Sequence, residues 1–155
     1  MPMRIGTDMP ELNGATEWIN GEAAREQLVG APTLVHFWAT SCYICKNNLP
    51  TLQEWRDTYA AKGLKVVAVH MPRSEDDTNI AKVRADIETY GITEPCAVDN
   101  NHDIKDAFQN DQGFVPAYFL FDAEGKMRNR TAGDAGLKML EGALKRMMDA
   151  EPAAV

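Results

Sequence analysis

Two cysteines three residues apart are the side chains of this sequence best suited to chemistry. They are Cys42 and Cys45, in the stretch FWATSCYICKNNLP that spans residues 37–50. A pair at this spacing can help to ligate a metal, form a structural disulfide, or exchange electrons with other thiols. The elements that position the pair must decide between these uses.

The segments on either side of the pair predict a β-α-β series. The run TLVHFWA at 33–39 is largely apolar, as is typical of a strand covered on both faces, and LKVVAVHM at 64–71 is a second such run. Apolar residues recur at helical spacing over about 43–61, where Pro50 should kink the helix. A helix between two strands predicts that the strands are parallel. Cys42 is then expected where a central strand ends and a helix begins.

The rest of the chain is expected to complete a mixed sheet. Ser74 and Asp77 are spaced like a capping box, which predicts that a helix starts there and that PRSEDD at 72–77 is only a loop and cap. Gly125 suits a hairpin turn between two late strands. The further elements expected are a strand at 95–99, a short helix at 103–109, strands at 117–121 and 126–131, and a last helix after Asp134. We therefore predict an α/β fold, a central mixed sheet with helices on both faces, as one domain over residues 1–155 with flexible ends at 1–3 and 150–155.

The predicted helix terminus favours redox chemistry for the cysteine pair. A helix N-terminus carries unsatisfied N–H groups and a partial positive charge, which stabilise a thiolate. Cys42 is therefore expected to be the exposed nucleophile, and Cys45, one turn further along, the resolving thiol. Three alternatives stay open: a structural disulfide, two buried cysteines paired by chance, and a zinc site. Zinc would need further ligands, and the remaining candidates lack ligand spacing: Cys96, His36, His70 and His102.

Composition excludes several classes of protein. The chain has 155 residues, of which 45% are hydrophobic, and a formal net charge of −7. Such a charge argues against nucleic-acid binding, which needs clustered Lys and Arg. The sequence contains neither a signal-peptide pattern nor an apolar run long enough to span a membrane, so we expect a cytoplasmic protein with no membrane partner. Thiols are kept reduced there, so a disulfide of this chain should be transient.

Three motifs taken in order give the chain a resemblance to the thioredoxin superfamily. They are FWATSCYIC, Pro50 five residues after Cys45, and FVPAYFLFDAEGK at 114–126. More narrowly, the chain resembles the TlpA/ResA-like thiol-disulfide oxidoreductases over about residues 4–148. The resemblance implies a thioredoxin-like three-layer sandwich. It also implies a cis peptide bond between Val115 and Pro116, beside which the backbone of Val115 pairs with an extended substrate segment.

Two positions depart from the patterns of these families. Thioredoxins carry a buried Asp six residues before the first cysteine, where this chain has His36. Cytochrome-maturation members carry a Glu three residues after the second cysteine, where this chain has Asn48. Because the attacking thiol of Cys45 must lose a proton and histidine changes charge near neutral pH, we hypothesise that His36 accepts that proton, directly or through water. The alternative is that His36 is a core residue with its hydrogen bonds satisfied.

Residues near the cysteines are assigned to substrate binding. Tyr43 and Ile44 form an apolar rim, and Trp38 either shields the cysteines beside the substrate or fills the core. The backbone of Val115 completes this set. Lys46 either helps to hold the Cys42 thiolate or is a solvated surface lysine. Outside the site, Cys96 is expected to pack in the sheet, with a regulatory thiol as the alternative.

These observations predict a thiol-disulfide oxidoreductase that acts as a reductase on disulfides in proteins or small molecules. Electrons are expected to come from another dithiol or a low-molecular-weight thiol, because the sequence has no dinucleotide-binding fingerprint. No metal or organic cofactor is expected. One alternative is a peroxiredoxin-type peroxidase, although Ala39 stands where that family has a Thr. The other is a non-catalytic binding module or metal carrier.

Overall fold

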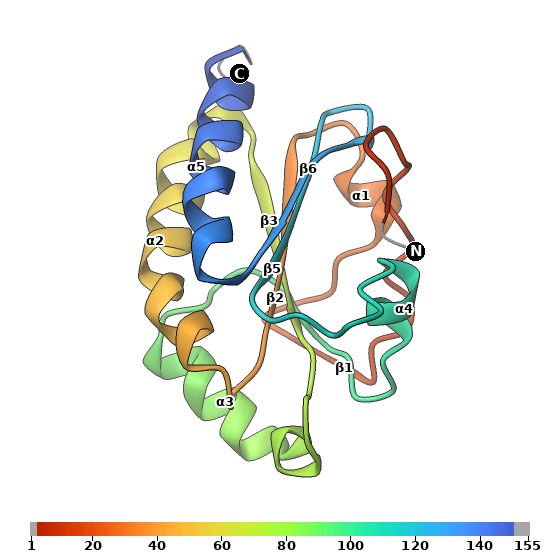
Figure 1. Ribbon diagram of the computed structural model, residues 1–155, viewed down its shortest axis with the longest axis vertical. Coiled ribbons are helices and arrows are strands. Elements are labelled where there is room, and N and C mark those ends of the chain that lie inside the picture. The colour runs from red at the N-terminus through yellow and green to blue at the C-terminus, as the bar shows by residue number, and fades with distance from the viewer. Residues whose placement is uncertain (1–2, 151–155) are drawn as a thin grey trace.

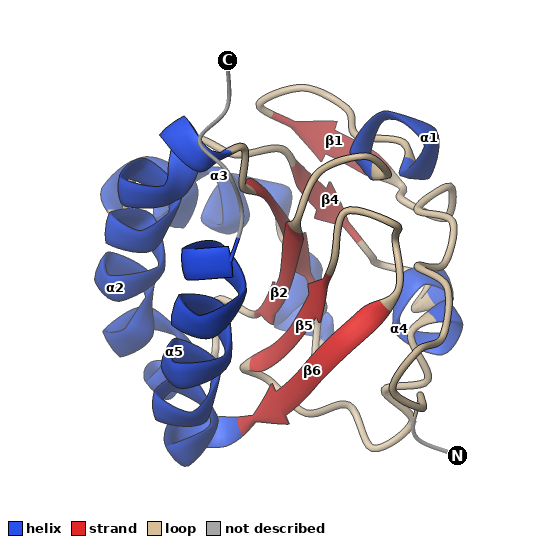
Figure 2. Ribbon diagram, turned by 90° about the horizontal axis from the view of Figure 1, so that it is seen from above, coloured by secondary structure: helices blue, strands red, loops and turns tan. Residues whose placement is uncertain are grey.

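The computed structural model describes residues 3–150, and its centre is a six-stranded mixed sheet in the order β1-β4-β3-β2-β5-β6. The strands are β1 (Glu17–Ile19), β2 (Thr33–Trp38), β3 (Lys65–His70), β4 (Cys96–Val98), β5 (Ala117–Phe121) and β6 (Met127–Ala132). The helices are α1 (Arg25–Leu28), α2 (Tyr43–Tyr59), α3 (Ile80–Thr89), α4 (Asp103–Ala107) and α5 (Gly133–Ala150), with 3₁₀ turns η1 (Ala60–Lys62) and η2 (Glu75–Thr78). Figures 1 and 2 show α2, α3 and α5 on one face of the sheet and α1 and α4 on the other. The predicted α/β sandwich is confirmed.

Strand β2 lies inside the sheet, between β3 and β5, and leads into the segment that carries the two cysteines. It pairs in parallel with β3 and antiparallel with β5, and β3 pairs in parallel with β4. The predicted parallel pair is confirmed, and so is the late antiparallel hairpin of β5 and β6. All six residues of β2 are buried, as expected for a strand covered on both faces.

Alternate residues of β2 enter two separate cores. Leu34 and Trp38 pack beneath α2 and α5, whereas Val35 and Phe37 pack on the face that carries α1 and α4. This follows from the two-residue period of a strand. His36 shares the face of Leu34 and Trp38, so it points toward the same core as the cysteine helix.

Two local expectations are wrong or changed. Ser74 does not start a long helix: the 3₁₀ turn η2 follows it, and α3 begins at Ile80, where the Asn79 side chain accepts a hydrogen bond from the Ala81 amide at 3.0 Å. Asp77 is unavailable for a capping box because its carboxylate binds residues of another segment. Pro50 lies inside α2, which is a single helix through that residue.

The ends of the fold also differ from expectation. Residues 1–2 and 151–155, which belong to the ends predicted to be flexible, lie outside the described residues. Met3 was predicted to be flexible, but its side chain is 3% exposed and packs in the second core, and Ala150 ends α5. Strand β1 and helix α1 were not predicted, because elements of 3 and 4 residues carry too little periodic pattern. Within residues 3–150, no helix combines the length and apolar character needed to cross a membrane.

Candidate active site

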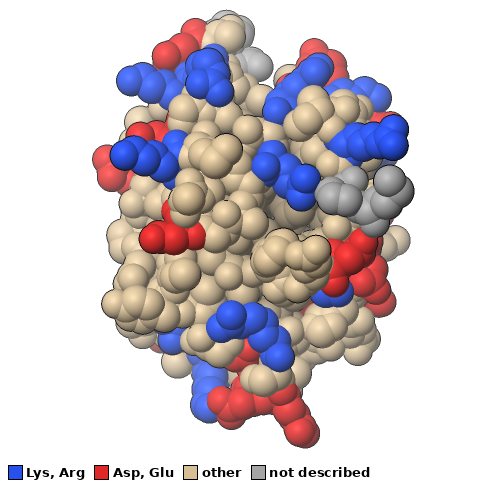
Figure 3. Space-filling view, viewed as in Figure 1, with Lys and Arg blue, Asp and Glu red and all other residues tan. Residues whose placement is uncertain are grey.

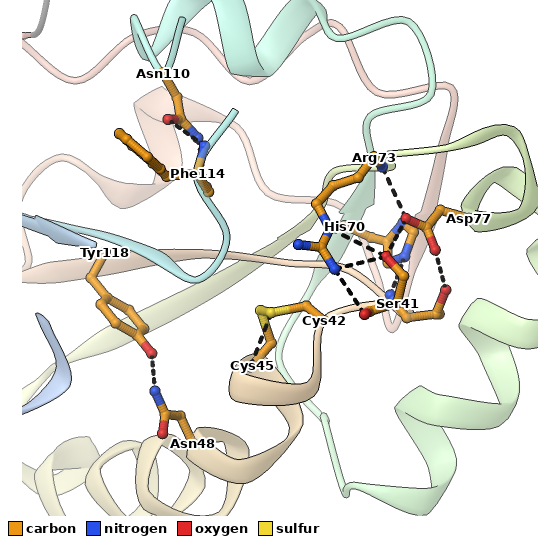
Figure 4. The surroundings of a disulfide bond; sticks show 11 residues. Ser41, Cys42, Cys45, Asn48, His70, Arg73, Asp77, Asn110, Phe114 and Tyr118 are labelled. Carbon is orange, nitrogen blue, oxygen red and sulfur yellow. Dashed lines mark hydrogen bonds between the residues drawn. A yellow bond between two sulfur atoms is a disulfide. The ribbon is translucent and has the colours of Figure 1, made fainter. Parts of the chain in front are cut away.

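The two cysteines form a disulfide where β2 leads into α2 (Figure 4). Their Cα atoms are 5.2 Å apart. Cys42 is the N-cap residue of α2, and its sulfur accepts a hydrogen bond from the Cys45 amide at 3.1 Å. No acidic residue lies in the first turn of α2. The positive end of the helix therefore acts on the Cys42 sulfur without an opposing carboxylate in that turn.

The expected exposure of Cys42 is wrong for the disulfide form. Cys42 is 3% exposed and Cys45 is 1% exposed, and both belong to the core that contains Trp38 and packs against Val115. The physical reason is that both sulfur atoms are joined in the disulfide and both side chains pack among the buried residues of this core. Attack by Cys42 on a substrate requires the reduced form, in which this bond is broken.

The segments that carry the disulfide and the cis-proline present exposed apolar side chains. Tyr43 is 77% exposed, Ile44 38% and Phe114 52%, and Val115 is half-buried. Tyr43 and Ile44 thus lie where an apolar rim was expected. The Val115–Pro116 peptide bond is cis, as the resemblance implied.

Phe114 was not singled out from the sequence, nor was Asn110, which holds it. The Asn110 amide donates to the Phe114 carbonyl at 2.9 Å and accepts from the Phe114 N–H at 3.2 Å (Figure 4). Both hydrogen bonds fix the loop that precedes β5. Asn110 and Phe114 are four residues apart in the sequence. That spacing is too common in loops to predict that Asn110 holds Phe114.

Trp38 is a core residue and cannot contact substrate in this structure. Its side chain is 1% exposed and packs edge-on against His70, with ring centroids 4.8 Å apart. The assignment of Trp38 to substrate binding is therefore corrected. It belongs to the same core as Cys42 and Cys45.

A hydrogen-bonded group that we call the Asp77 cluster holds the residues before Cys42. Asp77 is 1% exposed, and its carboxylate accepts from the Thr40 hydroxyl at 2.9 Å, the Ser41 hydroxyl at 2.7 Å and the Arg73 amide at 2.9 Å. Burial opposes ionisation, but these hydrogen bonds outweigh it and hold the pKa of Asp77 below its usual range. The remaining member is His70. The cluster ties the segment after β3 to the segment after β2.

His70 fixes the same loop through the backbone. Its Nε2 accepts a hydrogen bond from the Thr40 N–H at 3.1 Å, and burial lowers the pKa of His70 to about 4. The ring is therefore neutral at pH 7, as an acceptor at Nε2 requires. The Asp77 cluster was not predicted, although the order of strands and loops contained one signal for it. Segments that follow two neighbouring parallel strands meet at the same edge of a sheet, which brings 71–77 beside 39–41.

His36 belongs to a second group, which we call the Glu94 chain. His36 Nε2 lies 2.7 Å from Glu94 Oε2, and Glu94 Oε1 accepts from Arg56 Nη1 at 2.8 Å. The side chains are 1%, 5% and 18% exposed in that order. Burial opposes ionisation of Glu94, but the hydrogen bond and charge of His36, aided by Arg56, lower its pKa to about 2. His36 is therefore buried with a hydrogen-bond partner at Nε2, as expected for the alternative that it is a core residue.

Two further positions near the cysteines have ordinary partners. Asn48, in place of the family's Glu, is buried and donates to the Tyr118 hydroxyl at 2.9 Å, while burial raises the pKa of Tyr118 to about 12. Lys46 pairs with Asp86 at 3.3 Å, so its charge is directed at α3 and not at Cys42. The position of the family's Glu is thus held by an amide that is hydrogen-bonded to Tyr118 of β5.

The third cysteine packs in the sheet, as expected. Cys96 lies on β4 with no exposed surface, and burial raises its pKa to about 12. Among the described residues, no group of three or more metal-ligating side chains lies close enough to hold a metal ion.

The fold and site together define a class of protein. A disulfide closing a C-x-x-C segment at a helix N-terminus, next to a central strand of a mixed sheet, is the arrangement of a thioredoxin-like thiol-disulfide oxidoreductase. The family model described as AhpC/TSA family matches residues 5–130. The chain belongs to this family.

Two relatives and one solved structure agree with that class. The chain is 48% identical over 147 residues to thiol-disulfide oxidoreductase YkuV of Bacillus subtilis (strain 168), covering 94% of this chain and 97% of YkuV. It is 29% identical over 145 residues to thiol-disulfide oxidoreductase ResA of Bacillus thuringiensis (strain Al Hakam), covering 94% and 79%. The solution structure of a thioredoxin-like protein in the oxidised form has a TM-score of 0.88 at 46% identity, covering 97% of this chain and 100% of that one. The predicted fold, enzyme class and ResA-like resemblance are confirmed: the protein is a thiol-disulfide oxidoreductase.

Proposed function

We propose that this oxidoreductase works as a reductase in two exchange steps, with Cys42 as the nucleophile and Cys45 as the resolving thiol. The Cys42 thiolate attacks one sulfur of the substrate disulfide, and the other substrate sulfur leaves as a thiolate. The Cys45 thiolate then attacks the Cys42 sulfur of the mixed disulfide. This step forms the Cys42–Cys45 disulfide and releases the second substrate thiolate, so two electrons pass from the dithiol to the substrate.

The observation that carries the proposal is the hydrogen bond from the Cys45 amide to the Cys42 sulfur at the N-terminus of α2. An amide N–H and the helix dipole favour the thiolate over the thiol. Cys45 lies one turn inside the helix and lacks the N-cap position. The thiolate of Cys42 is therefore stabilised more than that of Cys45, as expected if Cys42 is the nucleophile and Cys45 the resolving thiol.

The substrates that we propose are disulfides in proteins, docked on the apolar rim. Tyr43, Ile44 and Phe114 supply exposed apolar surface next to the disulfide. Val115 and Pro116 are proposed to receive an extended substrate segment, with the backbone of Val115 as the pairing partner. The physiological reductant is proposed to be another dithiol or a low-molecular-weight thiol, and the cytoplasmic location and single-domain organisation of residues 1–155 stay predictions.

His36 is proposed as the proton acceptor for Cys45, and its contacts restrict how it would act. The Glu94 carboxylate can only accept, so Nε2 of His36 carries the hydrogen between them. Accepting the Cys45 proton therefore requires the neutral ring, on which Nδ1 is the remaining acceptor. Replacing His36 by Phe and following resolution of the mixed disulfide against pH tests this role. An unchanged pH profile would leave His36 as a core residue.

Reduction of insulin by the reduced protein tests the proposed direction and roles. Cys42→Ser is expected to abolish reduction, because no nucleophile remains. Cys45→Ser is expected to accumulate a mixed disulfide with the substrate through Cys42. Both variants keep a side chain of similar size, so circular dichroism serves as the folding control.

A redox titration of the Cys42/Cys45 couple tests the direction independently. A potential near ~−270 mV is expected for a reductase, whereas ~−120 mV would indicate an oxidant. Consumption of peroxide by Cys45→Ser would instead support a peroxidase. Stoichiometric uptake of zinc or copper without insulin reduction would support a metal carrier.

A further inference from the structure

We infer that Arg73 is a specificity-determining residue that binds a carboxylate next to the reacting disulfide of the substrate. This inference rests on the proposed function, since it concerns the partner that Cys42 attacks. The substrate class is then narrower than disulfides in general. It consists of disulfides that carry an acidic group beside the sulfur under attack.

The Arg73 side chain is held over the residue that precedes Cys42. Its Nη2 donates to the Ser41 carbonyl at 2.8 Å and to the Ser41 hydroxyl at 3.1 Å, and its Nε donates to that hydroxyl at 3.2 Å. Ser41 is itself anchored to Asp77 at 2.7 Å. Figure 4 shows the guanidinium group on the side of this loop that faces the disulfide. An exposed arginine is thereby fixed in place, which lowers the entropy lost when it binds an anion.

The guanidinium group of Arg73 donates its hydrogen bonds to two uncharged oxygens of Ser41, the hydroxyl and the carbonyl. Among the described residues, no ion pair involves its guanidinium group, whereas Lys46 pairs with Asp86 and Lys82 pairs with Asp76. The Asp77 carboxylate accepts a hydrogen bond from the backbone amide of Arg73 and not from its guanidinium group. The other donors to this carboxylate are the Thr40 and Ser41 hydroxyls. Arg73 therefore keeps donors and charge available for a planar anion such as a carboxylate.

The position of Arg73 complements the apolar rim. Tyr43 and Phe114 offer surface to apolar parts of a substrate, and Arg73 adds one cation beside Ser41. The whole chain carries a net charge of −7, so a cation here runs against its overall charge. Charged side chains of both signs, separated by uncharged surface, lie on the face in Figure 3. The combination fits a peptide with an apolar residue and an acidic residue flanking its cysteine.

A second role for Arg73 has to be distinguished, because a nearby cation also stabilises the Cys42 thiolate. Thiolate stabilisation changes the rates with two alkylating reagents of the same mechanism by a common factor. Carboxylate binding changes only the rate with anionic electrophiles. Iodoacetate and iodoacetamide separate the two effects, since the Cys42 thiolate displaces iodide from both and only iodoacetate carries a carboxylate.

The experiment measures alkylation rates of the reduced Cys45→Ser protein with both reagents, with Arg73 intact or replaced. The iodoacetate-to-iodoacetamide rate ratio is expected to fall about two- to fivefold in Arg73→Gln, the range for an exposed ion pair. Lys82→Gln removes the same charge from an exposed side chain nearby and should leave the ratio unchanged. The difference should shrink in 1 M salt, which screens interactions between exposed charges that are more than about 3 Å apart.

Equal ratios with and without Arg73, or rates that fall by one common factor, would overturn the inference. A second readout uses two peptide disulfides that differ by Glu or Gln beside the cysteine. The wild type should prefer the Glu peptide through a lower KM, and Arg73→Gln should not. Reduction of the uncharged compound bis(2-hydroxyethyl) disulfide tests the proposed function separately. This reaction needs Cys42 and Cys45, but the substrate carries no carboxylate for Arg73 to bind.

Discussion

The Asp77 cluster and the Glu94 chain each use one buried carboxylate to join distant segments, but they differ in what they hold. Asp77 binds two hydroxyls and a backbone amide, and these belong to the loop that enters the cysteine helix and to the segment after β3. Glu94 binds the charged or chargeable side chains of β2 and α2. The first arrangement fixes a reactive loop and the second fixes the core. Variants of Asp77 should change reactivity as well as stability, and variants of Glu94 should change mainly stability.

The largest effect is expected from Glu94→Ala. Removing this carboxylate leaves His36 and Arg56 without their shared partner, which should lower the free energy of unfolding by about 3 to 5 kcal/mol in urea titrations. Asp76→Ala breaks the exposed Lys82 pair and should cost about 1 kcal/mol or less. A loss in Glu94→Ala no larger than this control would contradict a stabilising role for the chain.

The next effect is a pH dependence that His70 imposes. Its pKa falls from 6.5 to about 4 on folding, so between these values the unfolded chain binds a proton that the folded one does not. The stability is fully present above pH 6.5 and is lost as the pH falls to about 4, by roughly 3 kcal/mol at most. His70→Gln removes this titration. Urea unfolding at several pH values should therefore give a flatter curve for the variant, and parallel curves would argue against it.

Asp77→Asn is expected to have a smaller effect on stability and a specific effect on activity. The amide places a donor where Asp77 now accepts from Ser41 and the Arg73 amide, which should cost about 1 to 3 kcal/mol. Because the loop before Cys42 loses its anchor, insulin reduction should fall about tenfold. Asp76→Asn is the matched control and should retain wild-type activity. If Asp77→Asn were fully active, the cluster would be structural only.

The smallest effect is expected from Tyr118→Phe, which removes the hydroxyl that Asn48 contacts at 2.9 Å. The loss of one hydrogen bond should lower the free energy of unfolding by about 1 kcal/mol. The redox potential of the dithiol should not change. A double-mutant cycle with Asn48→Ala measures the coupling, and a shifted potential would place this pair with the reactive region.

Local patterns in the sequence were enough to predict the framework of the site. The apolar run of β2 and the helical spacing after it placed Cys42 at the start of α2. Gly125, with φ of 77°, supplies the expected left-handed hairpin position. Each of these features depends on neighbours within a few residues, which is why residue type and spacing predicted them.

Long-range partners were not predictable in the same way. Asp77 is spaced from Ser74 like a cap, yet it binds Thr40 and Ser41, 37 and 36 residues away. Glu94 lies 58 residues from His36, and no local pattern links them. Such contacts depend on the register of parallel strands. The interpretation of 72–77 as only a loop and cap failed for that reason.

The isolation of Cys96 has a consequence for the life of the dithiol. A thiol without exposed surface and with a pKa raised to about 12 is almost never ionised at pH 7. It therefore cannot compete for the bond that joins Cys42 to Cys45, although all three belong to one core. Repeated oxidation and reduction of Cys42 and Cys45 are therefore expected to restore the same disulfide each time.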